Sequence, residues 1–127
     1  MQDEQRRAEG QKIRRAVLGE AHVEAAQAGL NEFNRDFQDF ITRTAWGEAW
    51  ARPGLERKTR SLLTLAMMIA LNREHEFKIH ILGAFNNGVS RDEIKEVILH
   101  CAIYAGVPAA NSAMGWAQAA FAALDEA

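Results

Sequence analysis

The sequence has too few cysteines for a disulfide scaffold or a zinc site. Its 127 residues include one cysteine and four histidines. A single cysteine cannot form an intramolecular disulfide or a dithiol redox pair, and one cysteine with scattered histidines does not supply four zinc ligands. We therefore expect no metal, and we expect the protein in the reducing cytoplasm, where free thiols persist.

An excess of basic charge is also missing. The chain has 15 Lys and Arg against 17 Asp and Glu, which gives a formal net charge of -2, whereas nucleic-acid-binding domains usually carry a basic excess. No apolar run is long enough to cross a bilayer, and the first fifteen residues are charged where a secretory signal would be apolar. We expect neither a nucleic acid nor a membrane as a partner.

The sequence is rich in apolar residues at helical spacing. Hydrophobic residues make up 48% of the chain and only two residues are proline, which predicts an all-α fold of about six helices in one domain, residues 1–127. Residues 2–18 are mostly charged with a narrow apolar stripe. They predict a surface or arm helix that Gly10 weakens in its middle.

Two further segments are predicted to supply the core. A helix beginning near Asn31 places four apolar residues on one face, which we expect to be buried: Phe33, Phe37, Phe40 and Ile41. From Thr59 a helix is apolar on nearly every side after its first turn, which predicts a central helix surrounded by others. Between the two, residues 44–54 end in a proline and a glycine and predict a helix end or loop.

The C-terminal half has clear helix boundaries. A helix over about residues 73–86 is predicted to stop at a left-handed Gly88. Ser90 and Glu93 form a capping-box pattern, and Pro108 suits the first position of the last helix. The alanines of that last helix permit close helix approach, so they indicate either self-association or packing of the helix into the core of a monomer.

His80 is the most promising acid–base residue. His75, Glu76 and His80 resemble a zinc-protease motif, but the histidines are five positions apart instead of four, so the two rings lie on different faces of a helix. Glu76 lies one turn before His80, close enough to hydrogen-bond an imidazole nitrogen. The pair is either a titratable site at the edge of the core or a core histidine held by a carboxylate. Cys101, on an apolar face, is interpreted as a core residue.

Three blocks of the sequence resemble the carboxymuconolactone decarboxylase and alkylhydroperoxidase D-like superfamily. Redox members of that superfamily carry C-x-x-C-x-x-x-H, and here Arg73 and Glu76 occupy the cysteine positions while His80 is kept. Thiol-based peroxide reduction is therefore disfavoured, whereas acid–base chemistry is retained. The blocks are IRRAVLGEAHV (13–23), EFNRDFQDFITRTAWGEAW (32–50) and the segment from KTRSLLTLAMM to AGVPAANSA (58–113).

The resemblance implies an alkylhydroperoxidase D-like helical bundle that assembles as a homo-oligomer, a hexamer or a trimer, without a cofactor. It implies conversion of a small lactone dicarboxylate, 4-carboxymuconolactone, to 4-oxoadipate enol-lactone and CO2 in the β-ketoadipate (protocatechuate) pathway of aromatic catabolism. Two alternatives remain at this point, a peroxidase-like oxidoreductase of the same superfamily and a non-catalytic helical binding or oligomerisation module.

Six residues are candidates for this chemistry. His80 and His22 would donate protons, and Glu76 would orient His80. Arg43 and Arg60 would clamp the retained carboxylate or, alternatively, form ordinary ion pairs. Trp46 would wall the pocket.

Overall fold

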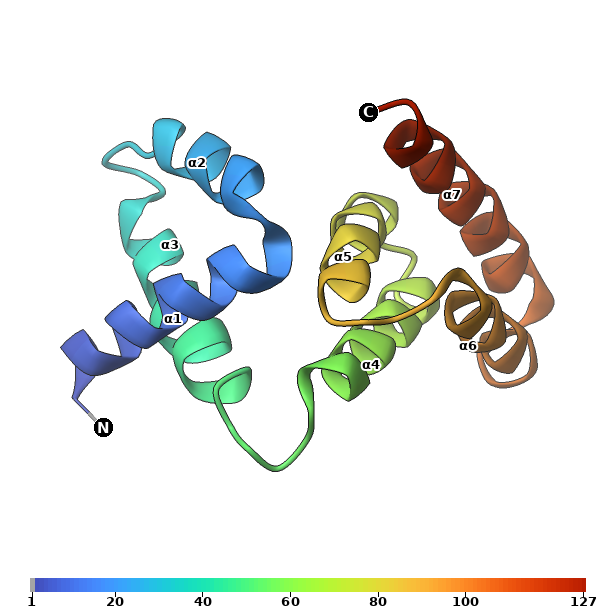
Figure 1. Ribbon diagram of the computed structural model, residues 1–127, viewed down its shortest axis with the longest axis horizontal. Coiled ribbons are helices and arrows are strands. Elements are labelled where there is room, and N and C mark those ends of the chain that lie inside the picture. Colours follow the sequence, from blue (N-terminus) through green and yellow to red (C-terminus); the bar gives the residue numbers. More distant parts are fainter. Residues whose placement is uncertain (1) are drawn as a thin grey trace. The chain divides into compact units, whose positions relative to one another are not determined.

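The computed structural model describes residues 2–127, which contain seven α-helices, one π-helical segment and no strand (Figure 1). The all-α prediction is confirmed, with seven α-helices where about six were expected. The chain divides into two compact units, the first running to Arg57 and the second from Lys58 to Ala127. The single domain over residues 1–127 stays a prediction. Within the described residues, no helix combines the length and the apolar character needed to cross a membrane.

The first unit contains four helical elements and the second contains the other four. The first has α1 (Asp3–Leu18), α2 (Glu20–Ala28), α3 (Arg35–Ile41) and the π-helical segment η1 (Thr42–Ala49). The second is formed by α4 (Arg57–Ala70), α5 (Glu74–Asn86), α6 (Arg91–Tyr104) and α7 (Val107–Asp125).

Helix α1 packs closely against η1 at two glycines. A Cβ atom added to Gly10 would lie 2.1 Å from the carbonyl oxygen of Thr42, and one added to Gly47 would lie 2.2 Å from the carbonyl oxygen of Arg6. Both distances are far shorter than a van der Waals contact, so the two backbones approach this closely only because both residues lack a side chain. Of the two alternatives predicted for residues 2–18, the surface helix with a narrow buried stripe is therefore confirmed and the arm is wrong. Gly10, which was expected only to weaken the helix, is a packing position.

The expected loop over residues 44–54 is helical in its first half. Helix α3 continues directly into η1, where the Trp50 amide donates to the Ala45 carbonyl oxygen at 2.9 Å, a spacing of five residues that defines a π-helix. Trp46 and Trp50 stack with ring centroids 5.1 Å apart. The irregular segment begins only after Trp50, so the helix end predicted from Pro53 is correct but later than expected.

The phenylalanine face predicted to be buried is exposed. The exposed fractions of Phe33, Phe37 and Phe40 are 97%, 62% and 48%, and α3 has no buried residue. The physical reason is that α1 packs on the segment after α3, so the buried positions of this stretch belong to η1 and include Thr42 and Trp46.

The second unit has a continuous apolar core contributed by all four of its helices. Its largest fully buried side chain is Phe77, which packs on Trp116 with ring centroids 5.7 Å apart. Helix α5 contributes Phe77, Ile81 and Ala84 to this core, and three alanines of α7 are buried in it. The buried core residues are Leu65, Ile69, Phe77, Ile81, Ala84, Val89, Ile94, Ile98, Cys101, Ala110, Ala113 and Ala117.

Helix α4 is less enclosed than predicted. It buries one stripe, which includes Ser61, Leu65 and Ile69 at a spacing of four residues, while Leu63 and Met67 are exposed. The prediction of a helix surrounded on nearly every side is therefore wrong within this unit, because apolar composition does not show how many neighbouring helices are available to cover it.

The predicted helix boundaries of this unit are confirmed with one small difference. Gly88 has a φ of 88°. The Glu93 amide donates to Ser90 Oγ at 3.1 Å, and the Ser90 amide donates to Glu93 Oε1 at 2.9 Å, which completes the capping box. Pro108 occupies the second position of α7 instead of the first, where its missing amide hydrogen is equally harmless.

Candidate functional site

Helix α5 positions the predicted histidine and glutamate one turn apart. Phe77 and Ile81 direct one face of α5 into the core. Glu76, in the first turn, is exposed, whereas His80 is half-buried. His80 thus lies at the edge of the core as predicted, and an acidic residue precedes it by four positions. His75, on the same helix, is exposed.

Arg60 lies in the first turns of α4 and is half-buried. Its carbonyl oxygen accepts a hydrogen bond from Thr64 Oγ1 at 2.8 Å. The second unit therefore carries three of the six predicted residues, Arg60, Glu76 and His80, and the first unit carries the other three, His22, Arg43 and Trp46.

Arg43 takes part in an ion-pair cluster of the first unit. Its Nε donates to Asp39 Oδ2 at 2.8 Å, and its Nη1 lies 3.6 Å from Asp3 Oδ2. Arg7 also donates to both carboxylate oxygens of Asp39. Hydrogen bonds from Arg7 and then Arg43 lower the pKa of Asp39 to about 2. The structural ion pair considered as an alternative for Arg43 is therefore present.

The other two predicted residues of the first unit lie on different elements. Trp46 is buried on η1, where its ring stacks on that of Trp50. His22 is half-buried on α2. It lies one helical turn before Ala26, which lines the pocket described next.

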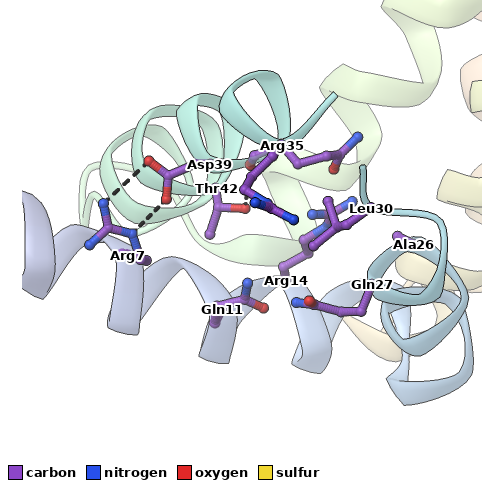
Figure 2. Close-up of a pocket in the computed structure, with 10 residues that line it drawn as sticks. Arg7, Gln11, Arg14, Ala26, Gln27, Leu30, Arg35, Asp39 and Thr42 are labelled. Atoms are coloured by element: carbon purple, nitrogen blue, oxygen red, sulfur yellow. Dashed lines mark hydrogen bonds and ion pairs between the residues drawn. The ribbon is translucent and has the colours of Figure 1, made fainter. Parts of the chain in front are cut away.

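The first unit contains an arginine-rich pocket that sequence reasoning missed (Figure 2). Its volume is about 160 Å³. Arg14 projects into it from α1 although its exposed fraction is only 7%. One feature of the sequence could have indicated this pocket: Arg14 is a basic residue next to Ile13, within the apolar stripe of α1. The lining residues are Arg7, Gln11, Arg14, Ala26, Gln27, Leu30, Arg35, Gln38, Asp39 and Thr42.

Cys101 is a core residue, as predicted. It is buried on α6, its Sγ lies 3.9 Å from the Ala66 carbonyl oxygen, and burial raises the pKa of its thiol. A thiol with a raised pKa forms little thiolate at neutral pH, and the thiolate is the nucleophilic form. Cys101 also borders an open, mostly apolar groove of about 500 Å³ between α4 and α6, where Glu93 and Glu96 supply negative charge.

The described residues form an all-helical protein, and comparison with known proteins identifies its family. The sequence pattern of the Carboxymuconolactone decarboxylase family matches residues 35–119. The chain is 56% identical to the 4-carboxymuconolactone decarboxylase of Acinetobacter baylyi over 95% of its own length and 90% of that protein. The chain belongs to the carboxymuconolactone decarboxylase family.

Two further relatives agree with this assignment. The chain is 48% identical to the nitrosuccinic acid decarboxylase npaB of Metarhizium robertsii, over 84% of this chain and 74% of that protein. It is also 50% identical to a 4-carboxymuconolactone decarboxylase sequence from Pseudomonas putida, over 38% of this chain and all of that sequence. All three relatives are named as decarboxylases.

Proposed function

We propose that this protein decarboxylates 4-carboxymuconolactone to 4-oxoadipate enol-lactone and CO2, within the β-ketoadipate route of aromatic catabolism. The observation that carries the proposal is the 56% identity to the Acinetobacter baylyi enzyme, which extends over 95% of this chain and 90% of the relative. An alignment of this length extends over nearly all of both units.

The chemistry of the substrate explains why side chains suffice. The departing carboxylate is attached to a lactone ring whose double bond is conjugated with the ring carbonyl. Electrons released with CO2 flow to that carbonyl oxygen, and a proton is then added to the carbon beside it. The enzyme must bind the second carboxylate, stabilise the enolate oxygen and supply the proton. We accordingly propose a reaction without a cofactor.

His80 is proposed as the main proton donor or oxyanion donor. A free imidazole has a pKa of about 6.5, so it exchanges protons near neutral pH. His80 is half-buried, and Phe77 and Ile81 anchor its helix in the core of the second unit. Glu76 would orient the ring, and His22 is proposed as the second donor.

The arginines and Trp46 would bind the substrate. Arg43 and Arg60 are both proposed to clamp the retained carboxylate, Arg43 through the N–H groups that it does not use for its hydrogen bond to Asp39. A guanidinium matches a carboxylate with two parallel hydrogen bonds. Trp46 would provide a dry wall beside the leaving carboxylate, which favours its conversion to neutral CO2.

We also propose that the chain forms a homo-oligomer, a hexamer or a trimer. The second unit exposes an apolar row at a spacing of four residues: Leu63 and Met67 on α4, and Leu71 directly after the helix. Further exposed apolar side chains follow at the end of α6 and the start of α7, including Ile103, Tyr104 and Val107. A row of exposed apolar side chains is a typical feature of an interface between proteins.

The activity is tested by mixing purified protein with 4-carboxymuconolactone and measuring CO2 and enol-lactone formation. Turnover that continues after treatment with chelator and dialysis is the expected result. A parallel assay with an organic hydroperoxide and a dithiol tests the peroxidase alternative, which the buried Cys101 does not favour. Peroxide reduction without decarboxylation would overturn the proposal, and inactivity towards both substrates would favour the non-catalytic module.

A further inference from the structure

The arginine-rich pocket of the first unit contains a buried positive charge. Arg14 is 7% exposed and lies between Ile13 and Val17 on the buried face of α1. Burying a guanidinium is unfavourable unless it is paired. Burial lowers the pKa of Arg14, and no carboxylate opposes that effect. Within residues 2–127, no protein atom accepts a hydrogen bond from its buried Nε.

The acidic residue of the pocket, Asp39, is already paired with other arginines. Asp39 accepts hydrogen bonds from Arg7 and Arg43, which occupy both of its carboxylate oxygens. No carboxylate in the described residues forms an ion pair with Arg14 or Arg35. The pocket therefore has two arginines whose charge the protein itself does not neutralise.

These two arginines come from different helices and point into the same space. Figure 2 shows Arg14 extending from α1 and Arg35 from α3 into the space between the two helices. Gln11 and Gln38 also line this space, and the side-chain oxygen of each is buried without a hydrogen-bond partner in the described residues. Rotation of either amide by 180° would present N–H groups to a ligand instead.

The pocket is large enough for a small organic ion. Its volume is about 160 Å³, whereas a cavity needs only about 10–15 Å³ to hold one water molecule. Two guanidinium groups supply up to ten N–H donors in planar forks, a geometry that matches the oxygens of a carboxylate or phosphate.

We propose that this pocket binds a small oxyanion, a carboxylate or a phosphate, between Arg14 and Arg35. The anion neutralises the buried charge of Arg14 and connects α1 to α3. The inference rests on the first unit alone. It holds whether or not the protein decarboxylates the lactone, because neither Arg14 nor Arg35 is among the residues assigned to that reaction.

The test compares the melting temperature and the binding isotherm of the purified protein in sodium succinate, sodium phosphate and sodium chloride at matched ionic strength. A bound anion stabilises the folded state as its concentration exceeds its Kd, so we expect a higher melting temperature in succinate or phosphate than in chloride. A response to succinate alone identifies the carboxylate as the ligand, and a response to phosphate alone identifies the phosphate.

Variants establish where the anion binds. Arg14→Met should weaken binding at least about tenfold, because a charged hydrogen-bonding partner is lost, without lowering the melting temperature in chloride. Arg35→Gln, at an exposed position, tests the same site if Arg14→Met does not fold. Lys12→Gln removes the same charge from an exposed position of α1 and should bind normally. Equal melting temperatures in all three salts would overturn the proposal. So would a loss of anion affinity in Lys12→Gln as large as that in Arg14→Met.

Discussion

At the scale of single residues, His80 and its neighbour His75 provide a matched pair. His80 is half-buried at the edge of the core, and His75 is exposed on the same helix. If His80 donates the proton, His80→Ala should lower kcat for the lactone about a hundredfold or more. His75→Ala should retain activity, and both variants should keep their helical circular dichroism. Equal activity of the two variants would remove His80 from the mechanism.

Asp39 predicts a specific acid dependence of stability. Its pKa in the folded protein is about 2, below the value near 3.9 of an unfolded chain. A group with a lowered folded-state pKa stabilises the protein above its unfolded pKa, and this contribution is lost as the pH falls through the folded value.

We therefore expect Asp39→Asn to reduce the free energy of unfolding at pH 6, and the difference from the natural sequence should shrink between about pH 4 and pH 2. Urea unfolding across this range measures both proteins. Because Asp39 is partly exposed, the effect should be modest. A difference that is constant with pH would show that the ion pairs with Arg7 and Arg43 do not stabilise the fold.

At the scale of elements, the contact between α1 and η1 depends on glycine. Gly47→Ala would place a methyl group 2.2 Å from the Arg6 carbonyl oxygen, so the helices must separate. Overpacking of this kind typically destabilises a protein by about 1–3 kcal/mol. Denaturant unfolding should show this loss.

Gly115 provides the control for this substitution. It lies within α7, is exposed, and has no atom within 4 Å of an added Cβ. Gly115→Ala should leave stability unchanged or raise it by up to about 1 kcal/mol, because alanine favours the helix. Similar stabilities of Gly47→Ala and Gly115→Ala would contradict the close packing of α1 on η1.

The elements also show the limit of periodicity as a guide to burial. The phenylalanines before and within α3 have the spacing of a buried face, yet they are exposed because α1 packs on η1 instead. Conversely, Gly10 and Gly47 lie 37 positions apart in the sequence, and only their contact across two helices explains why both lack a side chain. Helical spacing identifies which residues share a face, whereas burial of that face depends on a distant partner.

At the scale of the whole molecule, the apolar row of the second unit predicts self-association. Met67 lies in the middle of this row, with Leu63 one turn before and Leu71 one turn after. Met67→Glu should place a charge in the proposed interface and shift the protein towards smaller species, which analytical ultracentrifugation detects.

Gln118→Glu introduces the same negative charge at an exposed position of α7 and should leave the mass unchanged. Sedimentation of the unsubstituted protein as a monomer would contradict the proposed oligomer. An unchanged mass of Met67→Glu would exclude this row from the interface.

Reading the chain alone was enough for the all-α class, the boundaries of the later helices and the half-buried position of His80. The signals involved are local, since a capping box, a left-handed glycine and a helical turn each involve residues within about four positions. The tertiary structure decided which face of α1 is buried, that the phenylalanines are exposed, and where the arginine-rich pocket lies. Arg14 and Arg35 belong to separate helices, and a pocket exists only where separate helices meet.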